Sequence, residues 1–498
     1  KKASPPHAAP AIVPPHALVM CKSATLAPDA ERFKAFSAAC AAAATADADE
    51  PSAAEEFPAF TRAEIASKRE DLLIVEDKVY SAERFRWAHP GGALFVSMFG
   101  GRDATLAFQS YHMRRFPHAT MTEYLVGTLA DAPQEMDEDH LALSNLVKPA
   151  LGASRGFAPT SQLVKAALLF ASAVAVEAYA LTAGRTFFNS ILLGLLFAMI
   201  GLNVQHDANH GTMSRRRGLS ALYGLAQSWI GGSQVMWLHE HVVLHHLHTG
   251  DRDMDPDAQL APAMRGYDTA PAYPWMRFQK YYLLLLELGY GAVPVFMALG
   301  ELAAWRHKFE AKYRLSTLAW WPWGVVSLAG HAAFYARFFV LPFVLVPEGA
   351  SRAVEAAKVA ATVVAGGFYL AFFFFLSHNF DGVKFVDGSR RDGSATYPPK
   401  EGGFLAQQVN ASSNVGGPWL CRLNGGLNYQ IEHHLFPRVA HAHYPTIAPI
   451  VKNFVETRCA GLCAYVHFDT VAQNLASVFA YLDKTGNPQN MPLSPKLD

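Results

Sequence analysis

Many of the 21 histidines of this 498-residue chain stand in three short segments whose spacing suggests metal binding. The segment 205–211, QHDANHG, has two histidines four residues apart. The segment 239–249, HEHVVLHHLHT, repeats this spacing and adds a histidine directly after it, and the segment 428–437, NYQIEHHLFP, places a glutamine before two histidines. Residues three and four apart share one face of a helix. The candidate ligands are His206, His210, His241, His245, His246, Gln430, His433 and His434.

Neutral imidazole binds first-row transition metals such as iron, copper and zinc. The histidines of the three segments exceed the four ligands of one tetrahedral zinc ion, so a pair of metal ions accounts for them more simply. If oxygen is to be activated, the metal must change its oxidation state, which favours iron over zinc. One isolated pair at this spacing is weak evidence, with about one true site in ten matches, but three segments reinforce one another.

Long apolar stretches beside these segments predict membrane crossings, since a helix needs about 20 apolar residues to cross about 30 Å of hydrocarbon. Four stretches qualify, at 163–183, 187–203, 324–346 and 353–377, and their few polar groups should face the helix bundle. A fifth stretch, 281–300, is expected to lie in the membrane plane. If it crossed the membrane, the basic loop 301–323 would lie on the non-cytosolic side, against the usual preference of basic loops for the cytosol. The three histidine segments then share the cytosolic face.

The overall composition agrees with a lipid environment and excludes two other classes of protein. The chain is 51% hydrophobic and 17% charged, below the usual quarter of charged residues. Its 42 basic and 42 acidic residues leave no basic footprint for nucleic acid, and five cysteines cannot build a disulfide-rich secreted scaffold. The acidic loop 251–257, DRDMDPD, is expected to be a solvated, turn-rich loop and not a cation site.

A separate pair of histidines lies in a soluble region nearer the N-terminus. The stretch 71–85 predicts two short strands joined by a turn, and the sequence HPGG follows it at 89–92. His112 lies 23 residues after His89, in a stretch with helical character. The Pro–Gly–Gly run alone could be a simple turn, so the evidence for a binding site is the combination of His89 with His112.

The three histidine segments resemble the histidine boxes of membrane fatty acid desaturases, and Gln430 at the start of the third box resembles the front-end subgroup. The region 57–129 resembles a cytochrome b5 domain. This resemblance implies that His89 and His112 are the axial ligands of haem b, which leaves the iron no open position and suits single-electron transfer. It also implies two non-haem iron ions held by all seven box histidines. His378, at the end of the last span, and Gln430, at the ligand position of the third box, are further expected ligands.

The expected fold is mainly α: a four-helix transmembrane diiron domain with a cytosolic helical cap, and a small N-terminal α+β haem domain. The expected parts are a disordered Ala- and Pro-rich leader (1–56), the cytochrome b5-like domain (57–130), a linker (131–156), the desaturase domain (157–470) and a C-terminal tail (471–498). His239 and His248 are expected in an outer layer or at the surface. Trp229, Trp237 and Tyr281 are candidates for an acyl tunnel or for the membrane interface.

The resemblance implies that O2 is used to insert a cis double bond between an existing double bond and the carboxyl end of a polyunsaturated acyl chain. Electrons would come from an NADH–cytochrome b5 reductase and pass through the haem. The substrate would be an acyl-lipid or an acyl-CoA. We expect delta-4 or delta-5 chemistry of algal type. The expected site is the endoplasmic reticulum membrane, with a plastid as the alternative. Two other functions stay open: a diiron lipid hydroxylase acting on sphingoid or acyl chains, and a non-enzymatic membrane haem carrier.

Overall fold

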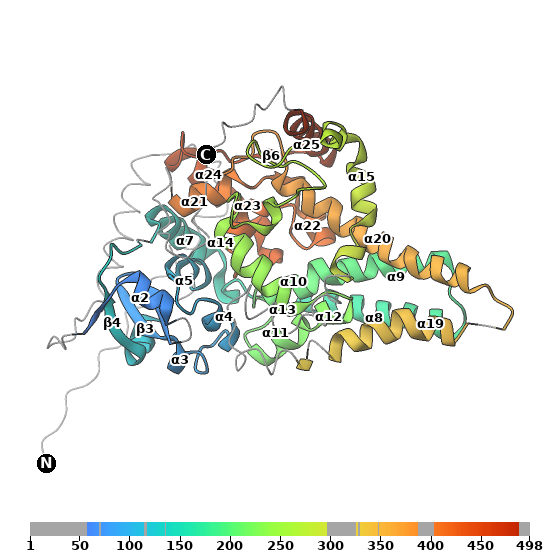
Figure 1. The fold of residues 1–498 in the computed structure, drawn as a ribbon, viewed down its shortest axis with the longest axis horizontal. Helices are drawn as coiled ribbons and strands as arrows, with labels where there is room; N and C mark the ends of the chain where they lie inside the picture. The colour runs from blue at the N-terminus through green and yellow to red at the C-terminus, as the bar shows by residue number, and fades with distance from the viewer. Residues whose placement is uncertain are drawn as a thin grey trace, which may run out of the picture. The chain divides into compact units, whose positions relative to one another are not determined.

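The computed structural model describes residues 57–68, 71–113, 117–134, 136–295, 325–326, 329–346, 348–386 and 403–487. The expected leader and the basic loop 301–323 lie outside these residues. Within them the chain is mainly helical, with a small sheet in its N-terminal part (Figure 1). The predicted fold class, a mainly α chain with a small N-terminal α+β domain, is confirmed.

A four-stranded sheet in the order β1-β4-β3-β2 is the framework of the N-terminal domain. Strands β2 (Leu72–Val75) and β3 (Lys78–Ser81) pair antiparallel across a turn at Glu76, whose φ is +58°. This confirms the two strands and the turn predicted within 71–85. Strand β4 (Leu125–Leu129) pairs with β3 and, in parallel, with β1 (Ala59–Phe60), so the two ends of the domain lie in adjacent strands.

Short helices pack on this sheet and position the two expected haem ligands. Helix α3 (Ala82–Phe85) precedes His89, α4 (Ala93–Met98) follows it, and α5 (Thr105–Tyr111) ends at His112. Apolar side chains from strands and helices share one buried cluster, which includes Leu73, Val75, Tyr80, Phe85, Val96 and Phe108. The domain therefore buries a hydrophobic core of its own.

Three helices in the described residues are long and apolar enough to cross a membrane. They are α8 (Thr160–Thr182), the continuous helix Phe187–Asn209 that begins with α9 (Phe187–Ile200), and α20 (Arg352–His378). They match three of the four predicted spans. The fourth, 324–346, is represented by a shorter apolar helix, Ala329–Val344, and part of that stretch lies outside the described residues. In Figure 1 these helices run side by side.

Helices α9 and α20 approach closely because glycines face each other at their crossing. A Cβ atom placed on Gly194 would lie 2.2 Å from the carbonyl oxygen of Thr362, and one on Gly366 would lie 2.8 Å from the carbonyl oxygen of Gly194. Small residues allow this kind of backbone contact between helices in a membrane, where van der Waals packing replaces the hydrophobic effect as the driving force.

The substitution Gly194→Ala should therefore destabilise the helix pair by about 1–3 kcal/mol, the usual cost of overpacking a tight contact. Thermal unfolding in detergent measures this as a lowered midpoint. Gly218→Ala is the matched control, because a Cβ atom there meets nothing within 4 Å. Equal midpoints for the two variants would show that the crossing is looser than described.

Polar groups within the apolar helices face the bundle, as predicted. Glu177 of α8 is 7% exposed and forms an ion pair of 2.5 Å with Arg337. The guanidinium of Arg337 also lies 4.7 Å from the ring centre of Trp229. His331 is 1% exposed, and its Nε2 lies 3.0 Å from the carbonyl oxygen of Gly232. Pairing of this kind removes most of the cost of placing charges among apolar helices.

The remaining helices form a cap beside the ends of the spans. Helix α15 (Gln279–Gly289) covers part of the stretch expected in the membrane plane and packs against α20 and α25 (Val471–Gly486). Its orientation to a membrane stays a prediction. Helix α7 (Glu138–Ala150) lies in the expected linker and packs on α24 (Tyr444–Arg458), and α25 lies in the expected tail. Both segments thus belong to the folded part of the chain.

Candidate metal centre

The first two histidine segments lie at π-helical turns. Helix α9 continues through a π-helical segment, η5 (Gly201–Gln205), into α10 (His206–Asn209), and the second segment lies in the π-helix η6 (Leu238–His245). A π-helix forms its hydrogen bonds between residues five apart, so positions i and i+5 come to one face. The Nε2 atoms of His241 and His246 are accordingly 3.3 Å apart. An ordinary α-helix, which we expected here, would not bring this pair together.

The third segment meets the end of the last span. Helix α23 (Gln430–Leu435) carries Gln430, His433 and His434, and His378 is the last residue of α20. The Nε2 atoms of His434 and His378 are 3.2 Å apart. The side-chain amide of Gln430 lies 2.9 Å from His378 Nε2 and 3.1 Å from His434 Nε2. All the expected non-haem ligands therefore converge, although they come from segments distant in sequence.

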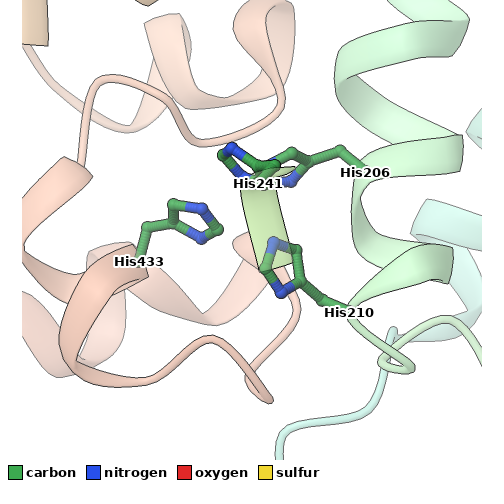
Figure 2. Close-up of side chains that lie close together, drawn as sticks. All are labelled: His206, His210, His241 and His433. Carbon is green, nitrogen blue, oxygen red and sulfur yellow. The ribbon is translucent and has the colours of Figure 1, made fainter. Parts of the chain in front are cut away.

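The converging side chains form two main groups in which ligand atoms lie within 4.8 Å of one another. The first group is His206, His210, His241 and His433, whose rings point toward a common centre in Figure 2. The second is His245, His378 and His434. The ring of His246 lies between them, 4.5 Å from that of His433 and 4.4 Å from that of His434. A further overlapping set joins His241, His245 and Asp257.

Outer partners fix several of these rings through Nδ1. His245 Nδ1 lies 2.9 Å from Asp255, and His433 Nδ1 lies 3.0 Å from the hydroxyl of Tyr444. His434 Nδ1 lies 3.0 Å from Gln408 Oε1. Histidine ligands of metals usually engage the second nitrogen in this way, which sets the tautomer and the ring orientation. The Nε2 atoms are thereby presented to the centre of the cluster.

Burial keeps most of the cluster in the form that binds metals. Desolvation, together with neighbouring imidazoles, lowers the pKa of His241, His246 and His433 well below its ordinary value, so these rings are neutral. For His245, burial also lowers the pKa, but the carboxylates of Asp255 and Asp257 outweigh it and raise the pKa to about 9. These carboxylates favour a proton on the Nδ1 atom that faces them.

The cluster fits transition-metal ions by its unpaired nitrogen atoms and by its spacing. In the described part of the chain, the Nε2 atoms of His245 and His433, and both ring nitrogens of His206 and His210, are buried without a hydrogen-bond partner. An unpaired buried polar atom is costly, so a ligand role accounts for them. The Nε2 separations of 3.2 and 3.3 Å match neighbouring ligands of one metal ion with bonds of about 2.1 Å.

The second candidate site is the histidine pair of the N-terminal domain. The ring centres of His89 and His112 are 6.2 Å apart, which leaves room for one metal ion bound by both rings. His89 Nδ1 lies 3.2 Å from the carbonyl oxygen of Gly92, and His112 Nδ1 lies 2.9 Å from that of Phe108. Burial lowers the pKa of His112 to about 4, so its ring is neutral. The pair thus suits two axial bonds to a haem iron.

Comparison with known proteins identifies the family of each of the two domains. Residues 183–465 match the family model "Fatty acid desaturase", and residues 59–130 match "Cytochrome b5-like Heme/Steroid binding domain". The chain belongs to the fatty acid desaturase family. It is 48% identical over 431 residues to an acyl-lipid (7-3)-desaturase of Rebecca salina, a match that covers 86% of this chain and 93% of the relative.

Two further relatives extend the comparison. An acyl-lipid (7-3)-desaturase of Diacronema lutheri is 46% identical over 87% of this chain and 94% of its own length. A chloroplastic acyl-lipid (7-3)-desaturase of Chlamydomonas reinhardtii is 31% identical over 81% of this chain and 78% of its own length. The protein is therefore an oxidoreductase of the desaturase family with a fused cytochrome b5-like domain. The cytochrome b5-like domain implies haem, and the desaturase family implies iron.

The acidic loop of this desaturase is only partly the solvated loop that we expected, because two of its carboxylates are buried. Asp251 is fully buried, and Asp255 is 3% exposed. Asp255 Oδ1 lies against His245, and its Oδ2 accepts the backbone N–H of Gly250 at 2.8 Å. Gly250 has a φ of +73°, so the backbone turns sharply directly after the second histidine segment and returns the carboxylate to it. Through Asp255, the loop thus contacts the Nδ1 side of His245 and helps to orient its ring.

Replacing Asp255 by asparagine should lower iron content and turnover by about 10- to 100-fold, the usual effect of removing an outer partner of a metal ligand. Asparagine keeps the side-chain volume but loses the charge that orients His245. Elemental analysis, with the haem iron subtracted, and product analysis measure the two effects. Asp253→Asn, on an exposed residue of the same loop, is the control. Equal iron content in both variants would contradict this role of Asp255.

Sequence reasoning also missed a buried network behind the first histidine segment. Asp207 lies directly after His206, and its carboxylate is 2.9 Å from Nδ1 of His441. Gln162 of α8 donates to the same carboxylate. A carboxylate between two candidate ligands was a visible signal for Asp207, whereas His441 has no informative spacing. The network joins the first span, the first histidine segment and the stretch after the third.

The aromatic candidates lie in three different environments. Trp237 stacks on His241 with ring centres 4.5 Å apart and also packs against His206 and His210. Trp229 packs among Phe170, Phe197 and Arg337 in the helix bundle. Tyr281 is 73% exposed. Only Trp237 thus borders the cluster. His239 and His248, expected in an outer layer or at the surface, are buried.

Proposed function

We propose that this desaturase inserts a cis double bond between an existing double bond and the carboxyl end of a polyunsaturated acyl chain, using O2 and electrons delivered through its cytochrome b5 domain. The observation that carries the proposal is the pair of histidine groups with His246 between them, in the same chain as the facing rings of His89 and His112. A haem with two axial histidines carries single electrons, and a histidine-bound iron pair can use them for oxygen chemistry.

The proposed ligands of two iron ions are His206, His210, His241, His245, His246, His378, His433 and His434. Gln430 is proposed as a weaker ligand or a hydrogen-bond partner of the second group, because its amide faces His378 and His434. His89 and His112 are proposed as the haem ligands. The bound iron would supply the oxidising power for removing hydrogen from unactivated carbons.

The residues around the cluster would position the ligands and keep water out. Asp255, Gln408 and Tyr444 hold imidazole rings by their Nδ1 atoms, and Trp237 covers the first group. The overall reaction balances: two hydrogens leave adjacent acyl carbons, NADH and one proton from the medium together supply two electrons and two protons, and O2 is reduced to two molecules of water. A buried site favours this outcome because bulk water would otherwise reach reactive species.

For the position of the new bond, we propose carbon 4 of the acyl chain. The relatives at 46% and 48% identity are both named acyl-lipid (7-3)-desaturases. We interpret these numbers as a new double bond three carbons to the carboxyl side of an existing one at carbon 7. A relative named acyl-lipid (8-3)-desaturase, from Physcomitrium patens, is 28% identical, so carbon 5 is the second choice. The same names favour an acyl-lipid substrate over acyl-CoA.

Expression in yeast fed a panel of polyunsaturated acids tests this function. We expect a product two hydrogens lighter than the acid supplied, with its new bond at carbon 4 by mass spectrometry of a derivative. A product one oxygen heavier would instead identify a hydroxylase, which needs the same ligands. No product, with iron present only at the level of haem, would favour a membrane electron carrier.

The proposed electron donor is an NADH–cytochrome b5 reductase, and the proposed location is the endoplasmic reticulum, with the histidine cluster and the haem domain in the cytosol. Three long apolar helices and the desaturase family support a membrane protein. The relative named as chloroplastic makes a plastid the alternative. Fluorescence microscopy of the tagged full chain in an algal host distinguishes the two membranes.

A further inference from the structure

Helix α5 of the haem domain ends at His112 and lies against the histidine segments of the desaturase domain. The hydroxyl of Tyr111 donates to the carbonyl oxygen of Val242, the residue that follows His241. Around this contact, Met98 and Ala107 share a buried apolar cluster with Val235, Met236, Val242, Val243 and Leu247. The residue before a proposed haem ligand thus touches the residue after a proposed iron ligand.

A second contact from α5 leads to the third histidine segment. Gln109 is 1% exposed and pairs with the backbone of Asp137 through both ends of its amide: Nε2 donates to the carbonyl oxygen at 2.8 Å, and Oε1 accepts the N–H at 2.9 Å. The same Nε2 lies 3.2 Å from Nδ1 of His140. His140 Nε2 lies 2.9 Å from the carbonyl oxygen of Leu435, the residue after His434.

The hydrogen bonds of this second contact are consistent with one tautomer of His140. The amide N–H of Gln109 donates to Nδ1, so the proton of a neutral ring is on Nε2 and donates to Leu435. Burial lowers the pKa of His140, which keeps its ring neutral. The ring also stacks on Phe436 at 5.8 Å and meets Phe404 edge-on at 5.3 Å. His140 is therefore held in one orientation, as a fixed link and not a mobile one.

We propose that α5 is the docking element of the haem domain, and that Gln109, Tyr111 and His140 fix His112 against the second and third histidine segments for electron transfer within one chain. Electron tunnelling falls steeply with distance and proceeds better through covalent and hydrogen bonds than through gaps, so a fixed, bonded contact favours transfer. Gln109, Tyr111 and His140 are positioning residues. This inference rests on the proposed delivery of electrons through the haem domain.

The electron balance sets what the contact must do. Each transfer oxidises one ferrous haem to ferric and reduces the non-haem iron site by one electron. A reductase of the NADH-dependent flavoprotein class then restores the ferrous haem. Two transfers, two protons and one O2 accompany the loss of two hydrogens from the acyl chain, which gives one double bond and two waters. The docked haem domain therefore has to deliver two electrons, one at a time, for each product.

The test compares Gln109→Leu and Tyr111→Phe with the parent, all as full-length, haem-loaded protein. Leucine has a similar size to glutamine but loses both ends of the amide pair, and phenylalanine removes only one hydroxyl from the apolar contact. Glu123→Gln, on an exposed residue of the same domain, is the matched control. Haem absorbance shows that each variant keeps a folded haem domain.

Two measurements decide the proposal. Hydrogen–deuterium exchange should become faster in α5 and around residues 137–140 in both test variants, and not in the control. In stopped-flow experiments, reduction of the haem by NADH and reductase should be unchanged. Reoxidation in air, with phosphatidylcholine vesicles carrying polyunsaturated chains, should slow about tenfold or more, since a misplacement of about 1 Å can cost far more than that.

An excess of free cytochrome b5 should restore product formation in both variants, because it bypasses the fused route. Reoxidation at the parental rate in variants with faster exchange would overturn the proposal, and so would unchanged exchange. The proposed function fails in a different way: the parent itself would then form no desaturated product with any electron source. The exchange measurement does not depend on turnover and keeps the two outcomes apart.

Discussion

We expect the variant His434→Ala to form no desaturated product while it keeps its haem absorbance. His434 is fully buried, and its Nε2 lies 3.2 Å from that of His378 and 3.1 Å from the amide of Gln430. Its ring also lies 4.4 Å from that of His246 and 5.4 Å from that of His433, which belongs to the first histidine group. Removing it takes a nitrogen from the second group and leaves a cavity beside the first. The loss should exceed the roughly 100-fold effect of removing an outer partner.

The measurement is product formation in lipid-fed yeast, beside total iron and haem absorbance of the purified variant. Haem should stay at one per chain, whereas non-haem iron should fall. His467→Ala is the control, because this exposed histidine lies on the short strand β6 (His467–Phe468) and outside every cluster in the described residues. Desaturation at the parental level in His434→Ala would remove His434 from the metal site and weaken the second group as a whole.

The second large effect is expected from His89→Ala, which should lose the haem spectrum and, with it, turnover supported by NADH. The two rings of His89 and His112 lie 6.2 Å apart across the proposed iron position. With one ring absent, a haem would have an open coordination position and half of its protein ligands. The non-haem iron content should stay at the parental level, because the histidine groups of the desaturase domain are separate from this pair.

The rescue experiment for His89→Ala separates the haem domain from the chemistry of the membrane domain. An excess of free cytochrome b5 should restore part of the product, whereas the same addition should not help His434→Ala. The control variant is His118→Ala, which replaces an exposed histidine of the same domain. Full turnover in His89→Ala without free cytochrome b5 would show that electrons reach the desaturase domain by a route that avoids the fused haem.

Local spacing was enough to select the candidate residues. The repeats around His206 and His241 are informative because a helix places residues four apart on one face, whatever the rest of the fold does. The last apolar span also ends at His378, so the end of the predicted span and the candidate ligand coincide. The strand pair within 71–85 and the position of the HPGG run were also predicted from local sequence alone. These patterns depend on contacts between near neighbours in the chain, which a sequence encodes directly.

Several features could not be found in this way. The π-helix at Leu238–His245 brings His246 to the face of His241, but no residue type marks a π-helix as glycine marks a left-handed turn. The loop that carries Asp255 has the composition of a solvated loop, but Asp251 and Asp255 are buried, and the positive φ of Gly250 returns Asp255 to His245. His140 looked like one residue of a polar linker, and its contacts with Gln109 and Leu435 join distant segments.

The sequence by itself determined which residues are candidate ligands, where the apolar helices lie, and that a second histidine pair, a candidate for haem, is present. Only the tertiary structure decided which histidines share a group, which carboxylates and hydroxyls orient them, and how α5 meets the second and third segments. The physical reason is that donor chemistry and helical periodicity are local properties. The distance between two imidazoles from segments far apart in the chain depends instead on how the helices pack, down to close contacts such as that of Gly194 with Thr362.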